Sequence, residues 1–237
     1  MQILSRVQFG SLEHVLPVIL AIVFCVLLFN YAKSKSETTK RLIFKYLGVF
    51  VSGFIVVFHI YQIGFGTYNF KTDLPLFLCS FIALFIWVFT ITQKYILFEI
   101  LLFWIIAGTS QGVITPDISI GFPNFEYFRY WVVHLGLLTI IVYAIAVLKM
   151  TPTIKSVFKS FFTLQIYVVI ILAINYSLGT NYSYLNSKPI SGSVLDYLGD
   201  WPYYIIVVQL ILIPLFLLIY FPFYLVKKKS LNTIETL

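Results

Sequence analysis

Seven runs of mostly apolar residues, each long enough to cross a bilayer as a helix, fill most of this 237-residue chain. A crossing helix needs about 20 such residues, because the hydrocarbon layer is roughly 30 Å thick and each residue adds about 1.5 Å. With 60% hydrophobic and 11% charged residues, the chain is too apolar for a water-soluble domain. Runs of this length favour helices over the short alternating strands of a barrel. We therefore predict an all-α polytopic membrane protein, one domain over residues 1–237, with seven transmembrane helices at 12–31, 42–64, 74–92, 96–113, 128–148, 157–178 and 201–226.

The basic residues predict an orientation for this bundle. Lys and Arg in short loops stay preferentially on the cytoplasmic side. Only Arg6, Lys71, Arg129 and Lys188, out of 16 basic residues, fall in the set of connections that includes the N-terminus. The N-terminus is therefore predicted outside and the C-terminus in the cytoplasm. The net charge of +7 belongs to this topology signal, and no nucleic-acid partner is predicted.

Polar residues interrupt three of the runs at one predicted depth. Cys79 lies about five residues, or roughly 8 Å, from the outer end of its run. His59 and His134 lie at a similar depth, and Gln111 and Asn175 are predicted to join them. Ionisable residues in spanning helices usually face the bundle interior or a water-filled cavity, although a single polar residue there often only bonds a neighbouring helix. We expect this layer to form the floor of a cavity that opens outward.

Cys79 is the candidate nucleophile of this layer. A thiol becomes a nucleophile when a neighbouring imidazole takes its proton, and either His134 or His59 could serve. Cys25 lies deeper in an apolar stretch. We therefore expect it to pack in the bundle and to form no disulfide with Cys79.

Other interpretations of the same residues stay open. His59 and His134 could hold a haem, or could act as an acid and base beside a Cys79 that is merely packed. Two His and one Cys supply only three ligands without the paired spacing of a zinc site, so no metal and no cofactor is predicted. A non-enzymatic bundle that binds or transports a lipid or small solute is the main alternative to an enzyme. A transporter typically shows an internal repeat, and none is clear in this sequence.

Several motifs resemble those of the YwaF-type bacterial membrane proteins. The resemblance extends from about residue 42 to residue 224 and rests on motifs at 74–80, 115–117, 122–123, 128–136, 179–182, 185–189 and 198–203. That family is distantly similar to the eukaryotic transmembrane protein 164, which is described as an acyltransferase that moves fatty acyl chains between phospholipids through a Cys and a His. The resemblance implies a multi-pass protein of the bacterial plasma membrane with membrane phospholipids as partners; the oligomeric state is left open.

The resemblance also assigns roles within the predicted site. The Cys of the motif at 74–80 is Cys79, and the His of the motif at 128–136 is His134. These two are therefore the predicted catalytic residues of a lipid acyltransferase that acts near the outer leaflet. The predicted supporting polar layer comprises His59, Gln111, Asn175 and Asn181. The predicted basic rim for lipid phosphate comprises Arg129 and Lys188.

Overall fold

The computed structural model describes residues 7–189 and 193–235, and every regular element in that part is a helix. The long elements are α1 (Leu12–Lys33), α2 (Glu37–Gly64), α3 (Leu78–Thr92), α4 (Tyr95–Trp104), α6 (Phe125–Ala146), α7 (Ile154–Leu178) and α8 (Tyr203–Glu235). A π-helical turn, η1 (Ile105–Thr109), joins α4 to the short α5 (Ser110–Ile114). Two 3₁₀ turns, η2 (Tyr182–Tyr184) and η3 (Val194–Tyr197), lie between α7 and α8.

Six of these helical segments are long and apolar enough to cross a membrane, where seven were predicted. The exception is α3, whose 15 residues span about 22 Å. It begins at Leu78 and not at residue 74, because the proline at position 75 disfavours helical backbone in Leu74 and has no N–H to donate. The structure therefore supports a multi-pass bundle with six candidate spans and one shorter apolar helix among the described residues.

Polar capping residues explain why α2 and α7 begin before the starts predicted from the apolar runs. Helix α2 begins at Glu37, five residues before the predicted start, because the Ser36 side chain accepts a hydrogen bond from the Thr39 amide. Helix α7 begins at Ile154 after a capping box formed by Thr153 and Ser156. Such caps satisfy the amides that a helix leaves free in its first turn, so polar residues extend each helix beyond its apolar run.

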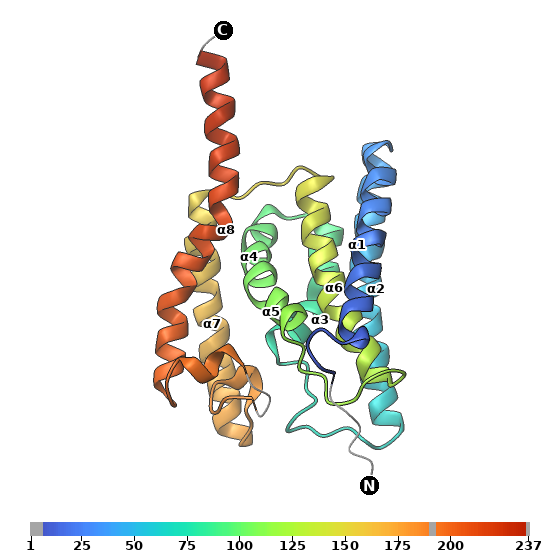
Figure 1. The fold of residues 1–237 in the computed structure, drawn as a ribbon, viewed down its shortest axis with the longest axis vertical. Coiled ribbons are helices and arrows are strands. Elements are labelled where there is room, and N and C mark those ends of the chain that lie inside the picture. Colours follow the sequence, from blue (N-terminus) through green and yellow to red (C-terminus); the bar gives the residue numbers. More distant parts are fainter. Residues whose placement is uncertain (1–6, 190–192, 236–237) are drawn as a thin grey trace.

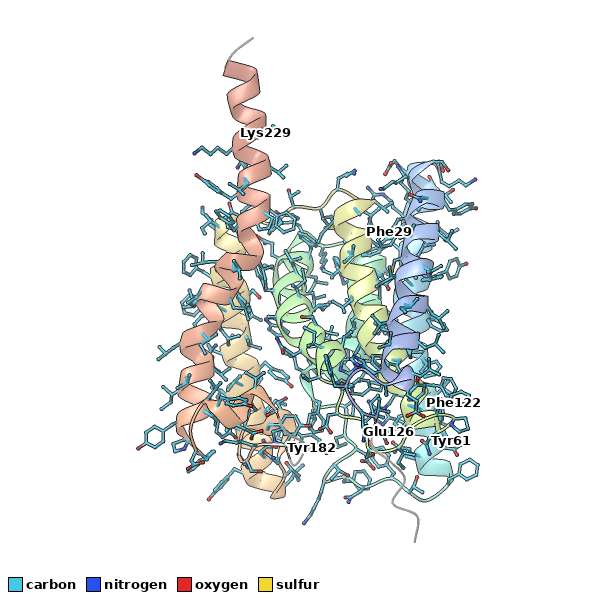
Figure 2. The ribbon with its side chains drawn as sticks, in the orientation of Figure 1. Phe29, Tyr61, Phe122, Glu126, Tyr182 and Lys229 are labelled. Carbon is cyan, nitrogen blue, oxygen red and sulfur yellow. The ribbon has the colours of Figure 1, made fainter. Side chains whose placement is uncertain are left out.

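Successive long helices alternate in direction, with the α4–η1–α5 segment acting as one rod (Figure 1). The start of α1 and the end of α8 consequently lie at opposite ends of the bundle. The connections 65–77 and 115–124 and the described parts of a third (179–189 and 193–202) lie at the end where α1 begins, which we call the loop end. Figure 2 places Glu126 and Tyr182 at this end and Phe29 and Lys229 toward the other.

Apolar side chains cover the outside of the bundle. On α1, Leu20 and Leu27 are exposed, and on α8, Leu210 and Leu218 are exposed in the same way. Water-soluble proteins rarely expose contiguous apolar surface of this kind. Because this surface requires an apolar solvent, the chain is an integral membrane protein.

Helices α2, α3 and α6 form the tightly packed part of the core. Phe44 contacts the rings of Phe89 and Tyr143 at centroid distances of 5.3 and 5.7 Å. Gly48 lets α2 approach α3 closely, since a Cβ at this position would lie 1.9 Å from Thr90 Oγ1. This packing fixes the first half of α2 against the ends of α3 and α6.

A buried carboxylate ties α4 to α7 at the end opposite the loops. Glu99 accepts hydrogen bonds from Ser156 Oγ and Lys159 Nζ, each at 2.7 Å. The Glu99 side chain is 3% exposed, whereas that of Lys159 is 47% exposed. An apolar environment makes the loss of a charge-assisted hydrogen bond costly, and the exposed lysine moderates that cost.

We expect Glu99→Gln to lower the free energy of unfolding by about 1–3 kcal/mol, because the amide loses the ionic bond to Lys159. Thermal unfolding in detergent micelles measures this change. The matched control is Glu37→Gln, which breaks an ion pair to Lys40. The Glu37 side chain is 70% exposed. That change should leave the free energy of unfolding essentially unchanged, because exposed ion pairs contribute little. Equal losses for the two variants would contradict a structural role for the buried pair.

Candidate active site

A cavity of about 900 Å³ lies at the loop end of the bundle. Its walls come from α2, α3, α6, the η1–α5 turn and all three connections of the loop end. Five of the predicted site residues line it: His59, Cys79, Gln111, Arg129 and His134. The structure therefore brings together side chains that the sequence placed only at a common depth.

Cys79 occupies the first turn of α3, where the helix begins after Phe77. Its Sγ forms a hydrogen-bonded pair with Thr109 Oγ1 at 3.5 Å, in which either group can donate. A helix N-terminus carries partial positive charge from its unpaired amides and favours a nearby negative charge. The Cys79 thiol thus lies at the positively polarised end of α3.

The partner of Cys79 comes from an irregular turn. Thr109 is fully buried and ends the π-helical segment η1. Single π-turns occur often at functional sites because they rotate the following side chains out of regular helical register. Here the turn brings the Thr109 hydroxyl to the thiol.

His134 on α6 is oriented by its own helix. Its Nδ1 lies 2.8 Å from the Tyr130 carbonyl oxygen. Because a carbonyl oxygen only accepts, Nδ1 carries the hydrogen, and Nε2 of the neutral ring holds the lone pair. The ring stacks on the Tyr130 phenol at a centroid distance of 4.0 Å. This arrangement suits His134 Nε2 to act as a proton acceptor.

Gly112 lies close to the His134 ring and limits where the ring can be placed. A Cβ at Gly112 would lie 2.6 Å from His134 Cδ2 and 2.7 Å from Nε2. The Gly112 carbonyl also accepts the Tyr130 hydroxyl hydrogen at 2.7 Å. The absence of a side chain at this position therefore allows the imidazole its place beside α5.

We expect Gly112→Ala to displace the His134 ring and to lower any His134-dependent activity by about 10- to 100-fold, since small misplacements of catalytic groups cost that much. The effect is measured as the rate at which an alkylating reagent modifies Cys79 and as the rate of any reaction that depends on His134. Gly53→Ala is the control, because nothing lies within 4 Å of a Cβ there. If both variants retain the parent rate, the proposed positioning role of Gly112 is wrong.

Cys79 and His134 make separate hydrogen bonds in this structure. The thiol pairs with Thr109 and the imidazole with Tyr130, and both side chains line the same cavity. Catalytic hydrogen bonds are often long in ligand-free enzymes and tighten when substrate binds. The two side chains therefore share one cavity, and these two hydrogen bonds do not join them to each other.

The described parts of the connection between α7 and α8 (179–189 and 193–202) line part of the cavity, and Asn175 holds the start of this connection. The Asn175 side chain accepts from the Tyr182 amide and the Thr180 hydroxyl, each at 2.8 Å, and donates to the Tyr182 carbonyl at 3.0 Å. The Tyr182 hydroxyl donates to the Phe70 carbonyl at 2.8 Å and accepts from the Leu74 amide. Burial raises the pKa of Tyr182, so its hydroxyl keeps the hydrogen that it donates.

The same connection reaches the cavity wall through strained backbone. Ser183 and Tyr184 adopt φ values of 56° and 54°, in the left-handed region that costs non-glycine residues about 1–3 kcal/mol each. The Tyr184 hydroxyl donates to Asp117 at 2.9 Å. Residues from the second and third loop-end connections therefore meet at the cavity.

Three predicted site residues lie outside the cavity lining. Asn175 is fully buried beneath its loop. Asn181 bonds Ser187 within the same connection, at 2.7 Å to Oγ. Lys188 lies 3.5 Å from Asp200. These placements correct the expectation that the two asparagines join the polar layer and that Lys188 lies on the cavity rim: the asparagines instead satisfy the backbone of an ordered loop.

The donor set of the site does not suggest a metal centre. No group of three His, Cys, Asp or Glu side chains within the described ranges is arranged to hold a metal ion. Both cysteines are free thiols, and Cys25 bonds Thr139 Oγ1 at 3.2 Å between α1 and α6.

Comparison with known proteins places this architecture in a family. The model of the TMEM164 family matches residues 9–220, which include every helix from α1 to most of α8. No curated protein and no solved structure matches the chain.

Proposed function

This chain belongs to the TMEM164 family, and from that premise we propose that it is a lipid acyltransferase that uses Cys79 as nucleophile and His134 as general base. The observation that carries the proposal is the shared cavity, which both Cys79 and His134 line. The thiol lies at a helix N-terminus, and the imidazole has its lone pair on Nε2. The resemblance to YwaF-type bacterial proteins and to the transmembrane protein 164 acyltransferase supports the same two residues.

The first half-reaction transfers an acyl chain to the protein. His134 Nε2 takes the Cys79 thiol proton, and the thiolate attacks the carbonyl carbon of a phospholipid ester. The ester C–O bond breaks, and the leaving alkoxide receives the proton from His134 as a lysophospholipid departs. A C–S bond now holds the acyl chain as a thioester on Cys79.

The second half-reaction reverses these steps with another acceptor. His134 takes the proton of an acceptor hydroxyl, and the resulting oxygen attacks the thioester carbonyl. The C–S bond breaks, a new ester forms, and His134 returns the proton to the Cys79 thiolate. The cycle conserves atoms and charge and needs no cofactor.

The orientation inferred from the basic residues supports a site at the outer leaflet of the bacterial plasma membrane. With the loop end outside, the cavity lies near the depth of the glycerol esters. The lipid ester can then reach Cys79, in the first turn of α3, without leaving the bilayer.

The test is acyl exchange by the purified full chain in a phosphate-free detergent, with a phospholipid whose acyl chain is isotopically labelled and an unlabelled lysophospholipid. The proposal expects labelled chains on the acceptor. The alternative, a bundle that binds lipids without chemistry, expects lipid binding but no transfer. Absence of transfer across phospholipids of differing headgroup and chain would overturn the enzymatic proposal.

A further inference from the structure

Three side chains in the cavity wall carry polar atoms that have no hydrogen-bond partner among the described residues. These atoms are His59 Nδ1 and Nε2, Gln62 Oε1 and Arg129 Nε, and all are buried. Buried polar groups are almost always paired, and an unpaired one needs an explanation such as a bound water or ligand. Here four such atoms belong to one cavity.

The three side chains come from two helices that pack together. His59 and Gln62 lie one turn apart near the end of α2, and Arg129 lies in the second turn of α6. The His59 ring is held between the edges of Phe58 and Tyr68, each with centroids 5.7 Å away. The packing thus fixes the imidazole while leaving both nitrogens unused.

Arg129 is held in a similar way. Its guanidinium lies 4.9 Å from the Phe58 ring centroid and donates from one terminal nitrogen to Glu126 at 2.9 Å. A guanidinium has five N–H donors in a planar fork that suits carboxylate and phosphate oxygens. The bond to Glu126 orients this fork, and the Nε donor remains available.

The acidic residues of the cavity are committed to internal bonds. Asp73 accepts from the Asn69 amide and from Thr72 Oγ1, each at 2.7 Å. Asp117 accepts from a tyrosine hydroxyl, and Glu126 is paired with Arg129. These bonds offset part of the negative charge that would otherwise repel an anion. By contrast, the two His59 nitrogens and Arg129 Nε have no hydrogen-bond partner among the described residues.

We propose that His59, Gln62 and Arg129 form a subsite for a phosphate oxyanion in the cavity that also holds Cys79. Arg129 Nε–H and one His59 N–H donate to phosphate oxygens, and Gln62 Oε1 accepts from a hydroxyl next to the phosphate. The subsite deepens the proposed function, on which it rests for the choice of a glycerophospholipid as ligand. It would anchor the headgroup while the ester reaches the thiol.

The experiment uses the full chain with Cys79→Ala, so that binding is measured without chemistry, in a phosphate-free maltoside detergent. Equilibrium binding is compared for a radiolabelled lysophospholipid and a monoacylglycerol with the same acyl chain. Arg129→Gln should weaken lysophospholipid binding about tenfold or more, the scale of a charge-assisted hydrogen bond. His59→Ala should weaken it several-fold. Neither variant should change monoacylglycerol binding by more than about twofold, because that ligand lacks the phosphate.

Lys188→Gln is the matched control, since Lys188 is a basic residue of the loop end that lies outside the cavity lining and should leave both affinities unchanged. Because Arg129→Gln leaves Glu126 without its ion-pair partner, the double variant Glu126→Gln/Arg129→Gln is measured as well and should show the same selective loss. Equal losses for both ligands, or no loss for either, would overturn the subsite.

Two sources of phosphate are separated by competition. Displacement of the lysophospholipid by excess inorganic phosphate supports a subsite that accepts the free anion. Displacement only by unlabelled lysophospholipid supports a lipid headgroup. Because the chain tested lacks the thiol, these results stand apart from the acyl-transfer assay: an active transferase can fail this binding test, and a chain without activity can pass it.

Discussion

Replacing Cys79 with alanine is expected to abolish acyl transfer, with a loss of at least about a thousandfold, because no other group in the cavity can form the covalent thioester. Cys79→Ser should be nearly as inactive, since a hydroxyl is far less acidic than a thiol. The serine can keep a hydrogen bond to Thr109, so its thermal unfolding should resemble that of the parent. Turnover of labelled phospholipid measures both variants.

Cys25→Ala is the matched control for this change. Cys25 bonds Thr139 between α1 and α6, away from the cavity lining. Its loss should cost some stability and leave the specific activity of the folded protein intact. If Cys79→Ala retains more than a few per cent of the parent activity, the nucleophile has been assigned to the wrong residue.

Replacing His134 with asparagine is expected to lower the turnover rate about 10²- to 10⁴-fold, the usual contribution of a general base. The asparagine amide can still donate to the Tyr130 carbonyl, as His134 Nδ1 does. The change therefore removes the proton acceptor at Nε2 with little effect on the helix. Single-turnover formation of the acyl-protein measures the loss directly.

His14→Gln provides the comparison for a histidine with a structural role. His14 Nδ1 accepts from the Gly10 amide at 2.9 Å, and Nε2 donates to the Val113 carbonyl at 2.8 Å. Both nitrogens are used, so this ring has no capacity for proton transfer. We expect His14→Gln to affect unfolding and not turnover. Similar rate losses in the two variants would show that His134 also acts only through the fold.

The membrane fold was predictable because solvent and length constrain it strongly. Long apolar runs must become helices in a bilayer, and each predicted run corresponds to a helical segment. The boundaries depended on polar capping residues such as Ser36 and Asn124, which lie outside the runs. The count of spans depended on residue 75, a proline that shortens α3 by a turn.

The candidate site was predictable in depth but not in contact. Helical rise alone places His59, Cys79 and His134 in one layer. Adjacency also depends on rotation around each helix, and the π-turn that brings Thr109 to Cys79 has no recognised sequence signal. Gly112 could have been noticed as a small residue on a spanning helix, where close approach is common.

The loop-end asparagines show a different limit. Asn175 lies within an apolar run and was predicted to face the cavity, yet its side chain bonds the backbone of Tyr182 and the hydroxyl of Thr180. A polar residue near a helix end satisfies the adjoining loop as readily as it lines a cavity, because both environments supply hydrogen-bond partners. Only the three-dimensional course of the loop decides between them.

The most direct test of the account is mass spectrometry of the full chain after brief incubation with labelled phospholipid and acid quench. The account predicts a hydroxylamine-sensitive acyl adduct on Cys79, none on Cys25, and its accumulation when no lysophospholipid acceptor is supplied. The central claim would be contradicted if the protein transfers acyl chains to an added lysophospholipid but carries no adduct on Cys79 when that acceptor is left out.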